Sequence, residues 1–121
     1  MRALILSATL AAALSAPALA DNYPVAGNWG QSSSSAKGAI DCTGKRVIAF
    51  NGNQRTDSNG GVPAYRNKSV TQAGPATYRI EDIFTTGQIS KGYARYTLRQ
   101  VDDDHIVMQM QNATLKLQRC K

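Results

Sequence analysis

The chain has one histidine, one tryptophan and two cysteines among its 121 residues, and these small numbers argue against several kinds of site. Two separate cysteines and the lone His105 lack the clustered spacing of a zinc site. The serine run from Ser32 to Ser35 has no nearby base that would turn one of its hydroxyls into a nucleophile. We therefore expect neither a catalytic set nor a metal site, and no motif indicates a cofactor.

The chain also lacks a calcium loop, although three aspartates precede His105. An EF-hand loop needs alternating oxygen ligands, a central glycine and a distal glutamate, and this segment does not supply them. We interpret Asp102 to Asp104 as a charged turn that leads into a strand. Beyond the turn, Ile106, Met108 and Met110 alternate as the core face of a strand does. A soft-metal site would need convergent histidines as well as these methionines.

The sequence has no dense basic run, although its formal net charge is +6. Its arginines are spread from Arg46 to Arg119, whereas a nucleic-acid surface is typically marked by clustered cations. We therefore expect no specific nucleic-acid partner. A modest positive charge favours contact with anionic envelope surfaces or with acidic partners.

Residues 1–20 have the features of an export signal. Arg2 precedes a short apolar run, and Ala18-Leu19-Ala20 has the small-x-small pattern of a signal peptidase site. The run is shorter than the ~20 residues that a membrane-spanning helix needs. We predict cleavage after Ala20. Residues 21–121 then form one domain without a membrane span, in the periplasm or outside the cell.

The two cysteines, Cys42 and Cys120, are expected to form a disulfide. An even number of cysteines in an oxidising compartment favours pairing, and the alternative is two free thiols. A domain of this size buries a modest core, so a covalent link between distant residues would stabilise it.

Short alternating segments separated by turns predict an all-β domain of about seven or eight strands. No window in residues 21–121 has apolar residues at helical spacing. We favour an antiparallel meander closed into a barrel, because closure leaves no sheet edge to protect, and a β-sandwich is the alternative. The expected strands cover residues 26–32, 45–50, 54–56, 68–72, 76–84, 93–101, 105–111 and 114–120.

Polar and charged residues on these strands suggest two further features. Asp82 falls on the apolar face of its strand, so we expect it to lie near a strand end or to have a partner. Arginines and tyrosines on other faces give a candidate interaction surface, because both residues are enriched at protein interfaces. The alternative is an ordinary outer face on which arginine stems cover apolar surface. The candidate residues are Tyr65, Arg66, Arg79, Tyr93, Arg95 and Arg99.

The motif Gly27-Asn28-Trp29-Gly30 near the start, with Arg119 near the end, resembles the calycin barrels, namely lipocalins and small bacterial metalloprotease inhibitors. The resemblance covers these two short motifs and the strand rhythm. It implies that Trp29 closes the base of a barrel and that Arg119 packs over the indole as a cation–π contact. The chain departs from both families. It is shorter than a typical lipocalin, and the inhibitors have their disulfide within the first half.

These observations predict an exported, non-catalytic binding protein that acts as a monomer, with a partner that the sequence does not identify. One version is an inhibitor of a protease or other exported hydrolase, which would use residues 21–26 or the loop 57–65. A second version is a carrier that holds a small apolar ligand against Trp29, Phe50, Tyr78 and Met108. A third is an envelope structural protein that binds anionic polymers through its positive charge.

Overall fold

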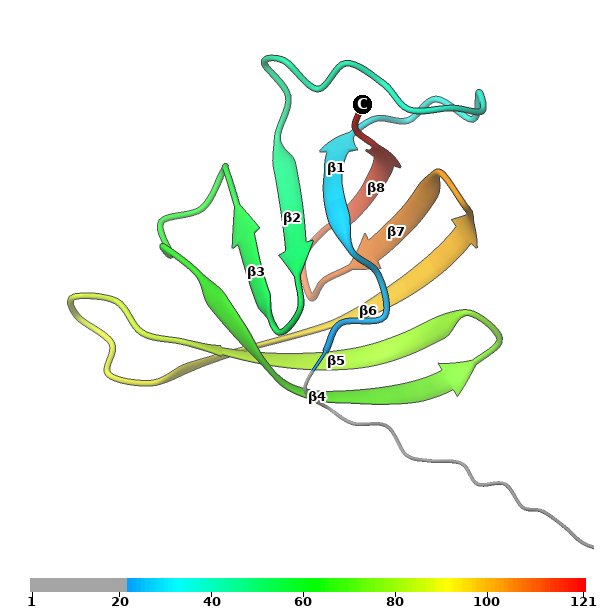
Figure 1. Ribbon diagram of the computed structural model, residues 1–121. Coiled ribbons are helices and arrows are strands. Elements are labelled where there is room, and N and C mark those ends of the chain that lie inside the picture. Colours follow the sequence, from blue (N-terminus) through cyan, green and yellow to red (C-terminus); the bar gives the residue numbers. More distant parts are fainter. Residues whose placement is uncertain (1–21) are drawn as a thin grey trace, which may run out of the picture.

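The computed structural model describes residues 22–121, and these residues form a closed barrel of eight antiparallel strands without a helix (Figure 1). Each strand pairs with the next, and the last pairs with the first. The barrel is the predicted fold, and the sandwich alternative is excluded. The predicted signal peptide and its cleavage site lie outside the described residues. The strands are β1 (Gly27–Gln31), β2 (Val47–Asn51), β3 (Gln54–Asp57), β4 (Tyr65–Gly74), β5 (Thr77–Phe84), β6 (Gly92–Asp102), β7 (His105–Gln109) and β8 (Thr114–Arg119).

The core lies inside the barrel, because alternate residues of each strand point inward. On β5 and β6, Ile80 and Tyr96 are paired neighbours and both are buried. Aromatic and aliphatic side chains of β1, β2, β7, β8 and the segment before β1 complete this buried core, and Val70 of β4 packs against it. The buried apolar residues are Tyr23, Val25, Trp29, Ile48, Phe50, Ile80, Tyr96, Leu98, Ile106, Met108, Leu115 and Leu117.

β4 is longer than the sequence predicts. The sequence predicts an extended edge or bulge over residues 62–65 and a separate strand over 68–72, whereas β4 is continuous over ten residues. Its register against β5 shifts twice, between Asn67 and Ser69 and between Gln72 and Gly74. Each shift inserts an extra residue and reverses which side chains face inward. The apolar alternation that identifies a strand in a sequence is therefore interrupted in β4.

The segment Asn22–Ala26 packs into one end of the barrel. The sequence predicts a short leader outside the ladder here, because Pro24 cannot donate a backbone hydrogen bond. In the structure, however, Tyr23 and Val25 are buried. The Tyr23 amide donates to the Gly52 carbonyl at 3.0 Å, and its ring meets Phe50 edge-on at 5.0 Å between centroids. Pro24 lies before the ladder, which begins at Gly27, and does not prevent its neighbours from packing inward.

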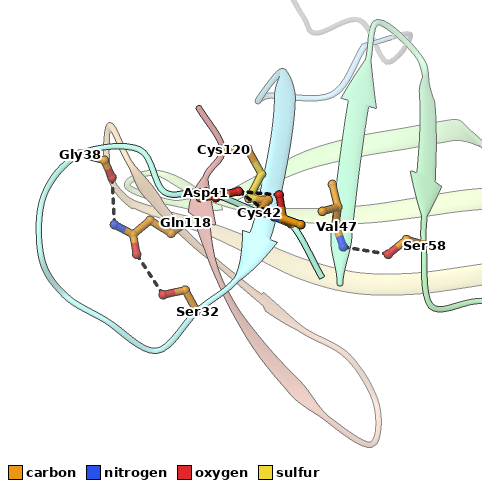
Figure 2. Close-up of a disulfide and its surroundings, with 9 residues drawn as sticks. Ser32, Gly38, Asp41, Cys42, Val47, Ser58, Gln118 and Cys120 are labelled. Carbon is orange, nitrogen blue, oxygen red and sulfur yellow. Dashed lines mark hydrogen bonds between the residues drawn. A yellow bond between two sulfur atoms is a disulfide. The ribbon is translucent and has the colours of Figure 1, made fainter. Parts of the chain in front are cut away.

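The predicted disulfide between Cys42 and Cys120 joins the β1–β2 connection to the end of the chain (Figure 2). Their Cα atoms are 5.6 Å apart. The Ile40 amide donates to the Arg119 carbonyl at 2.8 Å beside the bridge. Gly30 passes so close that a Cβ atom there would overlap the Cys42 sulfur. Only glycine fits at this point of β1.

Gln118 holds the β1–β2 connection against the outside of the barrel (Figure 2). Its side-chain amide donates to the carbonyls of Ala36 and Gly38, both at 2.9 Å, and accepts from the Ser32 hydroxyl at 3.0 Å. Gln118 is fully buried under this cover. The serine run is therefore anchored at Ser32, while Ser33, Ser34 and Ser35 remain exposed.

Candidate binding surface

Trp29 and Arg119 form the predicted contact where β1 and β8 close the barrel. They are partners in the β1–β8 register, and the Arg119 guanidinium carbon lies 4.4 Å from the indole centroid. Trp29 has no exposed surface, and its indole nitrogen donates to the Ala26 carbonyl at 3.1 Å. Arg119 also donates to the Asp103 carbonyl, so its charge lies over the ring in a fixed position. The arrangement covers an apolar side chain and leaves no opening for a ligand at Trp29.

Asp103 and Asp104 form the predicted turn between β6 and β7, and Asp102 is the last residue of β6. His105 Nδ1 lies 2.8 Å from an Asp102 carboxylate oxygen. This hydrogen bond, together with one from the Asp104 amide, lowers the pKa of Asp102. Asp104 accepts from the Gly38 amide at 2.9 Å, which ties the turn to the β1–β2 connection. Within residues 22–121, no three histidine, cysteine or acidic side chains gather as metal ligands would.

An ion pair between Arg55 on β3 and Asp82 on β5 occupies the barrel interior. Arg55 Nε lies 2.8 Å from Asp82 Oδ2, and their side chains are 4% and 0% exposed. Asp82 also accepts hydrogen bonds from the Tyr96 hydroxyl at 2.9 Å and from the side-chain amide of Asn67 at 3.3 Å. These bonds offset part of the cost of burying two charges. The inward position of Asp82 was predicted, and Arg55 is the partner that the sequence does not identify.

Three tyrosines surround this ion pair. The Arg55 guanidinium carbon lies 3.9 Å from the Tyr65 centroid and 4.9 Å from that of Tyr96. Burial raises the pKa of Tyr96 far above its ordinary value, which outweighs the opposite effect of the Arg55 charge. Burial also raises the pKa of Tyr23, and the Asp82 charge adds to the increase. Both phenols therefore remain neutral around the buried ion pair.

The outer surface of β4, β5 and β6 carries five of the eight lysines and arginines that lie on strands. We call this surface the basic face and define it by Arg66, Lys68, Arg79, Glu81, Tyr93, Arg95 and Arg99. Its five cations are all exposed, whereas its one carboxylate, Glu81, is mostly covered. The face is positive because these cations outnumber the acid, which favours an anionic partner.

Tyr93 and Glu81 organise the centre of the basic face. Glu81 binds Arg95 at 2.7 Å and Lys68 at 3.5 Å, so one carboxylate holds two cations. Both cations approach the Tyr93 ring, at 5.9 Å for Arg95 and 5.7 Å for Lys68. Among the described residues, Arg66, Arg79 and Arg99 form no ion pair. Tyr93 is 46% exposed, so an aromatic ring lies between cations that could contact a partner.

Tyr65 is the one predicted surface residue that does not lie on this face. Strand alternation places it opposite Arg66, and it turns inward against Arg55 and the ring of Phe84. Its centroid lies 5.3 Å from that of Phe84. The sequence prediction grouped Tyr65 with Arg66 because it did not place the two on one strand, where alternation separates their faces.

An open cleft of about 530 Å³ adjoins the basic face where β3, β4 and β5 meet. Apolar side chains of Tyr65, Ile83 and Phe84 line it, and Arg66 and Lys91 bring two positive charges to it. Both cations are exposed. The cleft therefore combines an apolar surface with positive charge, which suits an acidic segment that also carries apolar side chains.

Comparisons of the chain with protein-family models, with curated proteins and with solved structures give no match. In residues 22–121, no helix has the length and apolar character required to cross a membrane. The barrel is compatible with a calycin-like architecture. The candidate binding surface consequently rests on the geometry of this chain's own residues.

Proposed function

We propose that this protein is an exported, non-catalytic binding protein that holds an acidic partner protein against its basic face. The observation that supports the proposal is the concentration of exposed cations on β4, β5 and β6, where Glu81 is shielded and the one exposed carboxylate, Asp102, ends β6. Complementary charge speeds the encounter of two proteins and disfavours wrongly charged partners.

A protein partner is favoured because the basic face is not purely ionic. Exposed Tyr93 lies between Lys68 and Arg95. Tyrosine and arginine are the residues that most often contribute binding energy when an interface covers them. The adjoining cleft adds the apolar surface of Ile83 and Phe84. A polymer bound by charge alone would not need to contact these aromatic and apolar side chains.

The export half of the proposal rests on the leader sequence and on the disulfide. Cys42 and Cys120 are bonded, and such bonds persist in oxidising compartments. An acidic exported hydrolase is one partner class that fits. An inhibitor built on residues 21–26 has little support, because Tyr23 and Val25 are packed inside the barrel. The loop 58–64, next to the cleft, is the better candidate for contact with an enzyme.

The carrier version has less support than protein binding. Trp29, Phe50 and Met108, which would contact an apolar ligand, are packed among the buried side chains of the core. The Arg55–Asp82 ion pair takes up further interior space. An apolar ligand would have to displace well-packed side chains or a buried ion pair, and both are costly.

The proposal is tested by binding to purified exported proteases and glycosidases that range from acidic to basic. We expect acidic members to bind, more weakly as salt is added, since exposed charges are screened. Arg66→Glu/Arg79→Glu should weaken binding about ten-fold or more by placing like charges opposite the partner. The matched control is Lys37→Glu/Lys45→Glu, which changes net charge equally on the β1–β2 connection.

Equal losses for the two double variants would contradict the proposal, because binding would then depend on net charge alone. Binding only to anionic lipid vesicles or cell-wall polymers would instead support an envelope structural role. Substrate turnover that disappears in His105→Ala or Asp104→Ala would show an enzyme and would overturn the non-catalytic half.

A further inference from the structure

β4 has a free edge that begins where its pairing with β3 stops. The two strands share only the pairs Gln54↔Arg66 and Arg55↔Tyr65, and the Asn67 amide adds one bond to the Asn53 carbonyl at 2.8 Å. Residues 68–74 have β5 on one side, and within residues 22–121 no strand pairs with their other side. In Figure 1, β3 turns away from the start of β4 and leaves the rest of β4 at the border of the sheet.

The register identifies the backbone groups that face this edge. In an antiparallel ladder, successive residues direct their amide and carbonyl to opposite neighbours. The backbone amide of Asn67 faces β3. The register shift between Asn67 and Ser69 then moves by one residue the positions on β4 whose backbone groups face away from β5. Val70 and Gln72 therefore direct their backbone groups to the free edge. Among the described residues, neither amide has a hydrogen-bond partner on that side.

The edge is only partly protected against pairing. Exposed edge strands usually carry charges, prolines or bulges that prevent another strand from docking. In β4 the two bulges lie at the ends of the free edge, and Lys68 is the only charged residue within residues 68–74. Between them, Val70 and Thr71 favour extended structure. A short stretch around Val70 to Gln72 is thus suited to receive a strand.

We propose that the free edge of β4 binds an extended, acidic segment of the partner protein as an added strand. This inference rests on the proposed function, because the basic face lies directly beside the edge. A docked strand would form backbone hydrogen bonds with Val70 and Gln72, and its alternate side chains would lie on the same outer face as Arg66 and Lys68 of β4, with Arg79 one strand further from the edge. A second copy of this chain fits less well, since two basic faces would be brought together.

The test uses a synthetic peptide in which glutamate alternates with valine, labelled for fluorescence anisotropy. Gln72→Pro removes the amide that faces the edge and leaves the β5 ladder intact, because proline is tolerated at strand edges. Gln72→Ala keeps the amide and is the matched control. We expect Gln72→Pro to bind the peptide about ten-fold more weakly, from the lost hydrogen bond and the proline ring, and Gln72→Ala to bind like the parent.

Peptide variants test the same contact without changing the protein. Methylation of every second backbone nitrogen blocks one edge of the peptide, and methylation of the other set blocks the opposite edge. An added strand uses one edge, so one methylated peptide should lose binding and the other should keep it. Equal behaviour of the two peptides, or equal binding by Gln72→Pro and Gln72→Ala, would overturn the inference.

The charge variant separates the two proposals. If Arg66→Glu/Arg79→Glu weakens binding while Gln72→Pro and the two peptides show no edge effect, the basic face binds acidic partners without strand addition. If neither Arg66→Glu/Arg79→Glu nor Gln72→Pro weakens the binding of acidic enzymes or of the peptide, both proposals fail. A dimer of the parent protein that dissociates in Gln72→Pro would assign the edge to a second copy and would also overturn the inference.

Discussion

Arg55 on β3 and Asp82 on β5 form an ion pair across the point where the barrel has its shortest backbone ladder. The pair joins strands on either side of β4, at 2.8 Å between Arg55 Nε and Asp82 Oδ2. β3 and β4 share only two residue pairs, whereas β5 and β6 are paired along the whole of β5. A side-chain contact in the core therefore supports the barrel where backbone hydrogen bonds are fewest.

Removal of one partner of this ion pair should destabilise the protein strongly. Asp82→Ala leaves Arg55 buried without a counter-ion, and a broken buried pair costs about 3–5 kcal/mol in the free energy of unfolding. Urea denaturation measures the loss, with exposed Asp103→Ala as the control. Arg55→Met/Asp82→Leu should recover most of it, since no unpaired charge remains. A loss for Asp82→Ala no larger than for Asp103→Ala would contradict this prediction.

Stability should fall in acid through Asp57. Burial alone raises the pKa of Asp57, but hydrogen bonds from Arg46 and from the Asn59 amide outweigh it and lower the pKa below 3.8. Because the folded-state pKa is below the unfolded one, this contribution is present above pH ~4 and is lost as the pH falls through the folded-state pKa. Urea midpoints between about pH 5 and 2 should fall more steeply for the parent than for Asp57→Asn. Parallel curves would contradict the assignment.

The single tryptophan reports directly on the base of the barrel. Trp29 is fully buried beneath the Arg119 guanidinium, so acrylamide should quench its fluorescence weakly. Arg119→Ala removes the cover and should increase quenching, with a stability loss of about 1 kcal/mol. Arg99→Ala, on the outer face, is the control. Equal quenching in Arg119→Ala and the parent would show that the guanidinium does not shield the ring.

Loss of the disulfide should lower stability more than loss of any exposed side chain. Cys42 and Cys120 are 78 residues apart in the sequence. Closing a loop of this length is worth about 4 kcal/mol in the chain-entropy model. Cys42→Ala/Cys120→Ala should therefore show a much lower melting temperature, and dithiothreitol should reproduce the change in the parent alone. A reductant effect of similar size on the double variant would exclude the disulfide as its cause.

The sequence predicts the range of every strand except β4 to within two residues at each end, and the alternation of polarity is clearest in the second half of the barrel. Trp29 and Arg119 are likewise predictable, since glycine-flanked tryptophan and late arginine mark the two strands that close the barrel. The inward position of Asp82 is visible in the same alternation.

The remaining features depend on contacts between distant residues, which a single sequence does not record. Arg55 lies in a four-residue strand with too few positions to define a face. Tyr65 and Arg66 are assigned to opposite faces only once both are known to lie on β4, which begins three residues before the predicted strand. Tyr23 is buried by packing next to a proline that indicates a loop. The free edge of β4 results from unequal strand lengths, and polarity patterns carry no information on which neighbour is absent.

The pairing of β1 with β8 sets the order in which the barrel can assemble. All other strand pairs join neighbours along the chain and can form as local hairpins, but Trp29 must find Arg119 across nearly the entire domain. Long-range pairing of this kind is slow because the loop must close before contacts compensate for it. Barrel closure is thus expected to be a late folding event. The disulfide between Cys42 and Cys120 lies beside this pair. The rate at which it forms during oxidative refolding would therefore report when the barrel closes.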